Sequence, residues 1–97
     1  METDLDALSN SVLDSIEAGD YDEAEKRCRR LLLEYPEMLD GHDRLATLRE
    51  AQGRFKEAAE HYEKAMLVVH RHPEGTDQET VQELKEKRDR ALAKAKA

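Results

Sequence analysis

Four histidines and one cysteine are the side chains of this sequence best suited to acid–base, nucleophilic or metal chemistry. His70 and His72 lie two residues apart, but a metal site would need two or three further ligands that converge on them. A histidine near the end of a helix also interacts favourably with the negative end of the helix dipole. We therefore predict a structural role for this pair and no metal site.

The remaining candidates lack the neighbours that catalysis needs. Glu57 and His61 are one helical turn apart on what should be an outer face, so a solvated pair is expected. Cys28 has no base at a recognisable spacing, which favours a packed thiol over a reactive one. The sequence carries no phosphate-binding glycine loop, zinc quartet or nucleophile motif. It therefore predicts a protein that is not an enzyme and has no catalytic, cofactor-binding or metal-binding residues.

Composition favours half-exposed amphipathic helices over a thick globule, because hydrophobic residues make up 38% of the 97 residues and charged residues 40%. The formal net charge of −7 argues against binding to nucleic acid or to an anionic membrane. This charge is distributed unevenly. Residues 1–25 contain no Lys or Arg, whereas bases outnumber acids in residues 85–97.

The N-terminal residues are acidic and contain no apolar run, which argues against a secretory signal. No stretch of the sequence approaches the apolar length of a membrane span. The single cysteine, Cys28, cannot form an internal disulfide. Together these features predict a cytoplasmic protein.

Five amphipathic helices are expected from the spacing of apolar residues and from capping signals. They should cover roughly residues 4–18, 21–34, 39–52, 55–70 and 77–95. Three pairs have the spacing of a capping box, namely Thr3 with Asp6, Asp20 with Glu23, and Thr76 with Glu79. Pro36 should end the second helix, and the segment 72–75 should separate the fourth from the fifth.

An internal repeat relates the first half of the chain to the second. Gly19 and Gly53 are 34 residues apart, and each follows a helical pattern. The same spacing relates Tyr21 to Phe55, Ala24 to Ala58, Cys28 to Tyr62 and Leu31 to Ala65. A helix–turn–helix period of this length, with glycine, aromatic, alanine and bulky residues in this order, resembles the tetratricopeptide repeat.

The resemblance implies an all-α fold of two helix–turn–helix repeats plus a C-terminal capping helix, a fragment of a right-handed solenoid. It implies one domain over residues 1–97, with repeat one at about 5–38, repeat two at about 39–72 and the capping helix at about 77–95. It is weakest in the first helix. His42 stands where the family usually has a bulky residue, so packing is its expected role. Arg49 stands where the family more often has an aromatic residue, so the groove there should be more polar.

In this family the first helix of each repeat lines a concave groove that binds part of a partner protein. The corresponding residues here are Asp6, Ser9, Leu13, Ile16, Glu17, Asp40, Asp43, Thr47 and Glu50. This set is acidic with an apolar strip, so the resemblance implies a partner peptide or helix with basic and apolar residues. Family members that clamp the C-terminal carboxylate of heat-shock chaperones use Lys and Asn here, and these positions do not match them.

Three other interpretations stay open. The groove residues could form a plain solvated face. The chain could act in assembly as a weak homodimer, because two repeats and a cap fall below the three or so that usually make a stable array. The basic end, Lys85–Lys96, could contact an acidic partner, although bases at the end of a helix also complement its dipole and aid solubility.

Overall fold

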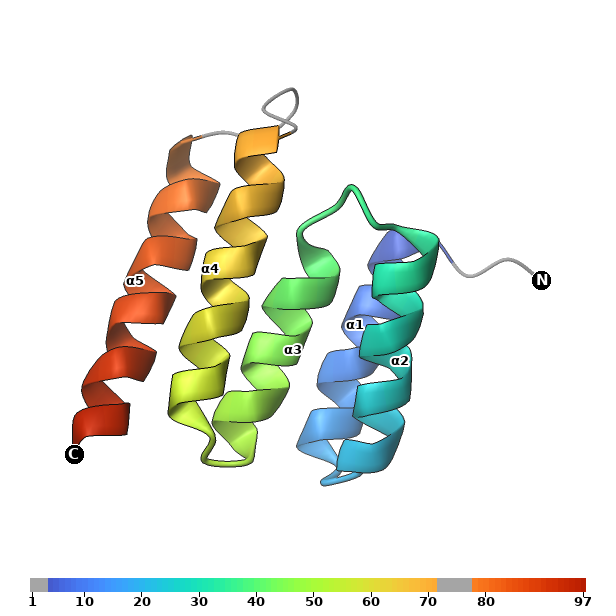
Figure 1. The fold of residues 1–97 in the computed structure, drawn as a ribbon. Coiled ribbons are helices and arrows are strands. Elements are labelled where there is room, and N and C mark those ends of the chain that lie inside the picture. The colour runs from blue at the N-terminus through green and yellow to red at the C-terminus, as the bar shows by residue number, and fades with distance from the viewer. Residues whose placement is uncertain (1–3, 72–77) are drawn as a thin grey trace.

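The computed structural model describes residues 4–71 and 78–97, which form five α-helices (Figure 1). The helices are α1 (Leu5–Glu17), α2 (Tyr21–Glu34), α3 (Asp40–Ala51), α4 (Phe55–Arg71) and α5 (Gln78–Lys96). The described residues contain no strand, and each helix begins and ends within one residue of its predicted position. The predicted all-α fold is therefore confirmed.

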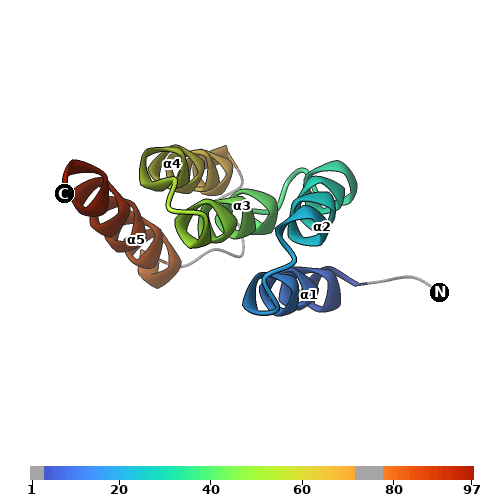
Figure 2. The same ribbon diagram turned by 90° about the horizontal axis from the view of Figure 1, so that it is seen from below.

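The helices form a flat stack of antiparallel neighbours. Figure 1 shows α3 at the centre, with α1 and α2 on one side of it and α4 and α5 on the other. Seen from below, α1 and α4 lie on opposite sides of α3 (Figure 2). The molecule measures 44 × 34 × 18 Å, and its smallest dimension is about the thickness of two packed helices.

Two hydrophobic clusters meet at α3. Leu45 and Leu48 of α3 pack with buried residues of α1 and α2, whereas Ala46 packs with buried residues of α4 and α5. The first cluster contains Leu8, Val12, Ala24, Cys28 and Leu31, and the second contains Ala58, Ala59, Tyr62, Ala65, Val69, Leu84 and Ala91. Because α3 supplies side chains to both clusters, it fixes the first helix pair relative to the second.

The two glycine turns have the same geometry. Gly19 and Gly53 have φ angles of 77° and 76°, in the left-handed region that glycine adopts without strain. Each glycine follows the end of a helix, and the amides of the glycine and of the next residue bond to the last turn. These bonds are Gly19 N to Ile16 O, Asp20 N to Ser15 O, Gly53 N to Glu50 O and Arg54 N to Arg49 O. This is the Schellman arrangement, so both repeats turn by one mechanism.

The helix caps agree with the sequence at one place and differ at another. Asp20 accepts a hydrogen bond from the Glu23 amide at 3.2 Å and caps α2 as predicted. At α1 the cap is Asp4, which accepts from the Ala7 amide at 2.7 Å. The prediction of a capping box between Thr3 and Asp6 was therefore wrong, because the residue next to Thr3 takes that role. The predicted Thr76 cap lies outside the described residues.

A small residue of α4, Ala58, is packed so closely that a larger side chain in its place tests the helix packing of the second repeat. Ala58 is fully buried, and Ala24 occupies the equivalent place in α2. We expect Ala58→Leu to overpack this contact and to lower the free energy of unfolding by about 1–3 kcal/mol. Thermal melting followed by circular dichroism measures the change. An unchanged melting temperature would show that α4 does not pack tightly there.

Candidate protein-binding surface

A chain of polar contacts joins the helices that the family resemblance assigns to the groove. The Ser9 hydroxyl of α1 donates to Asp40 Oδ2 of α3 at 2.9 Å and accepts from Arg44 Nε at 2.8 Å. Arg44 Nη1 lies 3.5 Å from Asp43 Oδ2, and Lys87 Nζ of α5 lies 3.6 Å from Asp43 Oδ1. Ser9 and Asp43 are buried. These contacts hold α1, α3 and α5 in register.

The predicted groove residues therefore divide by exposure. Asp6 and Glu17 are exposed, Leu13, Ile16, Asp40, Thr47 and Glu50 are half-buried, and Ser9 and Asp43 are buried. The seven residues with exposed surface are referred to below as the α1–α3 face. Within residues 4–71 and 78–97, neither Asp6 nor Glu17 forms an ion pair, so their charges are free for a partner. Ser9 and Asp43 are occupied by contacts inside the protein.

Tyr62 of α4 belongs to the second core cluster, and its hydroxyl reaches two residues of the α1–α3 face. Tyr62 is buried, and its hydroxyl interacts with Thr47 and Glu50 of α3. Burial, together with the nearby Glu50 and Asp43 carboxylates, raises the pKa of the Tyr62 hydroxyl well above its usual value. The phenol therefore stays neutral and braces the half-buried positions of α3.

Arg49 does not lie on the predicted groove. It is buried between α2, α3 and α4, where it meets two carboxylates that are only half-buried. Its guanidinium binds both oxygens of Glu25, at 2.7 and 3.2 Å, and its Nε lies 3.6 Å from Glu57. The hydrogen bond from Arg49 lowers the pKa of Glu25 despite the opposing effect of burial. The expectation of a more polar groove at Arg49 was wrong, because this position faces the neighbouring second helices.

His42 and His61 form a stacked pair between α3 and α4. Their ring centroids are 5.9 Å apart, and both Nδ1 atoms are buried without a hydrogen-bond partner among the described residues. Burial, with a smaller effect of Lys64, lowers the pKa of His42 and lowers that of His61 to about 4. His42 packs as expected. The interpretation of Glu57 and His61 as a solvated pair was wrong, because His61 packs on His42 and Glu57 pairs with Arg54 and Arg49.

The thiol of Cys28 is fully buried in the first core cluster. Burial raises its pKa from 9.0 to about 12, so the reactive thiolate is absent at neutral pH. Among the described residues, no group of three or more His, Cys, Asp or Glu side chains could hold a metal ion. His70 is exposed in the last turn of α4, and His72 lies outside the described residues.

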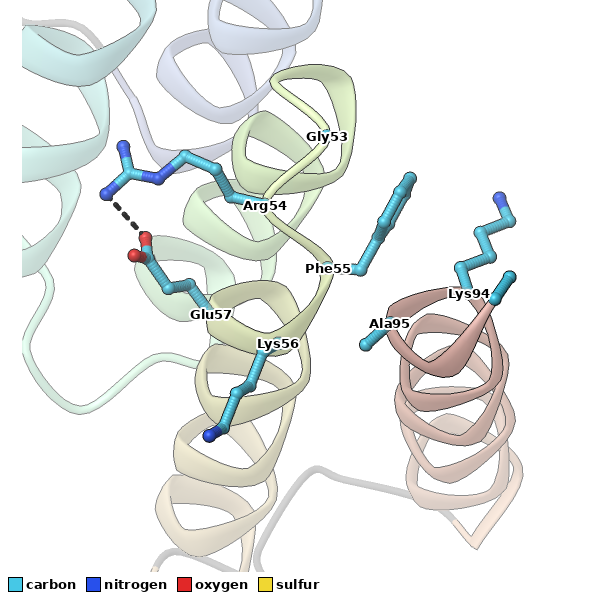
Figure 3. Close-up of a pocket in the computed structure, with 8 residues that line it drawn as sticks. Gly53, Arg54, Phe55, Lys56, Glu57, Lys94 and Ala95 are labelled. Atoms are coloured by element: carbon cyan, nitrogen blue, oxygen red, sulfur yellow. Dashed lines mark ion pairs between the residues drawn. The ribbon is translucent and has the colours of Figure 1, made fainter.

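A hollow of about 530 Å³ lies between the α3–α4 turn and the end of α5 (Figure 3). The Phe55 ring points toward the last turns of α5, where Lys94 Nζ lies 5.5 Å from the ring centroid. Arg54 points to the other side of α4 and pairs with Glu57 at 2.6 Å (Figure 3). The cation–π contact between Lys94 and Phe55 joins the C-terminal end of α5 to the start of α4, and α5 is helical as far as Lys96.

The sequence interpretation missed two residues of the polar contact chain. Arg44 lies four residues after Asp40, a spacing that places the two side chains on one side of the helix, and both of them contact Ser9. Lys87 offered no signal of this kind, because its contact with Asp43 depends on how α5 packs beside α3. The α1–α3 face is consequently bordered by a base that was assigned only to the cap.

Two antiparallel helix pairs with identical glycine turns, covered by a fifth helix, define a helical-repeat protein. A comparison with models of known families matches residues 15–87 to the tetratricopeptide repeat. The chain belongs to the tetratricopeptide repeat family. Such repeats generally mediate protein–protein interactions and are typically non-catalytic. No curated protein and no solved structure matches the chain.

The match begins at Ser15 and ends at Lys87, so it omits most of α1 and takes in half of α5. The omission agrees with the weak resemblance of the first helix. Among the described residues, none of the helices has the length and apolar character needed to cross a membrane.

Proposed function

We propose that this protein is a non-catalytic binding module whose α1–α3 face holds a segment of a partner protein that carries basic and apolar residues. Residues 1–97 would act as one domain with the repeat and cap boundaries given above. The buried, unpaired Cys28 supports a reducing compartment such as the cytoplasm.

The observation that carries this proposal is that Leu13, a partly exposed apolar side chain, lies between two carboxylates that form no ion pair among the described residues. This leucine keeps exposed surface and belongs to neither core cluster, although the next apolar residue along that side of α1, Ile16, packs on the first cluster. Asp6 and Glu17 lie one or two turns away on the same side of the helix and have no ion pair in the described part of the chain. An apolar contact flanked by free carboxylates suits a segment with basic and apolar residues.

Contacts inside the protein preorganise the α1–α3 face for binding. Ser9, Asp43 and Arg44 hold the helices beneath it, and Tyr62 braces Thr47 and Glu50. A partner would then lose little binding energy to ordering of the site. Charge would speed association, whereas Leu13 and Ile16 would supply contact that exposed ion pairs alone do not give.

Binding kinetics test the division of roles. Peptides are first selected by display on the immobilised full chain. Their association and dissociation rates are then measured by surface plasmon resonance on three proteins, namely the unaltered chain, the double variant Asp6→Lys with Glu17→Lys, and the variant Leu13→Ser. We expect the charge reversal to slow association about tenfold, and Leu13→Ser mainly to speed dissociation. Binding should weaken with salt but survive in part, because the apolar contact is not screened.

Matched controls lie on α4, which contributes no residue to the α1–α3 face. Glu60→Lys with Glu63→Lys makes the same change in net charge at exposed positions of α4 and should leave binding unchanged. The proposal is wrong if these controls weaken binding as much as the α1 variants do. A selected peptide that drives or disrupts a dimer in sedimentation would instead support the assembly role.

A further inference from the structure

Polar contacts join the first repeat to the second at two places along α3. Near the start of α3, the Asp40 and Arg44 side chains bond to the Ser9 hydroxyl of α1. Near its end, the Arg49 guanidinium bonds to both carboxylate oxygens of Glu25 on α2, at 2.7 and 3.2 Å. Asp40 and Arg49 are about 13 Å apart along the helix axis. The two contacts therefore hold the two ends of α3 against different helices of repeat one.

The Arg49 side chain is itself held in place by further contacts. It is buried, and its Nη1 also donates to Gln52 Oε1, just after α3, at 3.1 Å. Toward α4, its Nε lies 3.6 Å from Glu57. A second bond between α2 and α3, from the Tyr21 hydroxyl to the Ala51 carbonyl oxygen at 3.4 Å, is longer and weaker. One guanidinium therefore links α2, α3 and α4.

The repeat pattern does not account for this pair. In the 34-residue register, Glu25 corresponds to Ala59 and Arg49 to Ser15, so neither charge recurs at the equivalent position. Stability alone does not require the pair either, because replacement of a buried ion pair by apolar residues of similar volume is often neutral or stabilising. Hydrogen bonds are directional, whereas the apolar contacts of Leu48 in the first core cluster are not. A hydrogen-bonded ion pair at this junction is therefore suited to fixing an angle.

We propose that Arg49 is a positioning residue, which fixes the angle between the two repeats through its bond to Glu25. The α1–α3 face is divided between the repeats, since its α1 residues belong to repeat one and its α3 residues to repeat two. A fixed angle keeps these two halves at the spacing that one partner segment spans, so less binding energy is lost to ordering of the site. The consequence for binding rests on the function proposed above, whereas the fixed angle itself does not.

Residual dipolar couplings of the isotopically labelled full chain test the angle without any ligand, because they report the orientation of each helix. In the unaltered protein, couplings from α1–α2 and from α3–α5 should fit one common alignment tensor. In Arg49→Met the two sets should require different tensors, because the repeats reorient relative to each other.

A double variant separates positioning from stability. Glu25→Leu with Arg49→Met replaces the ion pair by apolar side chains and should leave the melting temperature unchanged or higher. We expect it to lose the common tensor nevertheless. A purely stabilising role of Arg49 would leave the common tensor intact in a variant of equal stability.

The matched control is Arg54→Met, which removes the same charge from an ion pair with Glu57 that lies inside repeat two. This control should keep the common tensor. Binding is measured on the same proteins with peptides selected by display on the full chain. Arg49→Met should raise the Kd about tenfold, Arg49→Lys should raise it less, and Arg54→Met should leave it unchanged.

A common tensor in Arg49→Met or in the double variant would overturn the proposal, as would an equal loss in the Arg54 control. A higher Kd without any change in the couplings would also overturn it, because Arg49 would then act on the peptide by another route. If the selected peptides bind away from the α1–α3 face, the function proposed above fails, and the couplings alone decide the role of Arg49.

Discussion

Removal of residues 77–97 is expected to leave a chain that aggregates or pairs with other copies more readily than the intact protein does. Leu84 and Ala91 of α5 are buried against Tyr62, Ala65 and Val69 of α4, and this apolar face would become exposed. Loss of the Leu84 contact alone costs about 2–5 kcal/mol, so the melting temperature should fall by roughly 15 °C. Sedimentation and thermal melting measure the two effects.

A substitution in the full chain separates packing from chain length. Leu84→Ala should lower stability in the same direction while α5 still covers most of the α4 face. Leu92→Ala, at an exposed position of the same helix, should have little effect. A truncated chain that stays monomeric and equally stable would mean that α5 is a loose tail and not a cap.

The second large effect is a loss of stability on acidification, caused by the stacked histidines. In the folded protein the pKa of His61 is lowered from 6.5 to about 4, so the fold favours the neutral ring. Below pH 6.5 the unfolded chain binds a proton that the folded chain does not, and stability falls as the pH falls from 6.5 to 4. By this linkage the free energy of unfolding should decrease by about 1–3 kcal/mol between pH 7 and pH 4 from His61 alone, because water screens part of the effect at a half-buried ring.

Two histidine variants separate the effect of His61 on the pH dependence of stability from the effect of the carboxylates. His61→Phe keeps an aromatic ring against His42 but cannot titrate, so its stability should depend less on pH than that of the unaltered protein. His70→Phe, at an exposed position, should preserve the original dependence. Urea unfolding at several pH values gives the free energies. Equal pH dependence of the His61 variant and the unaltered protein would show that the pair is solvated.

The helices and their turns could be predicted because their signals are local. Gly19 and Gly53 marked two turns with the same left-handed geometry, and Asp20 marked its cap. The 34-residue period then gave the pairing of helices, because each repeat can bury its apolar side only against the next.

The charged residues could not be placed in the same way, because their roles depend on contacts between helices. Arg49 was read as a groove residue, yet it pairs with Glu25, which lies 24 positions earlier in the chain. Asp43 and Ser9 were read as partner contacts, yet each is buried by a residue of another helix. A helical pattern shows which side of a helix a residue occupies but not which neighbour covers it.

The most direct test of the central claim is the mapping of amide signals on the full chain with a peptide selected by display. The account predicts that the shifted amides cluster at Asp6, Leu13, Glu17, Thr47 and Glu50. Leu13→Ser should raise the peptide concentration needed for these shifts without unfolding the protein. Shifts confined to the outer sides of α2 and α4, or to Lys85–Lys96, would contradict it.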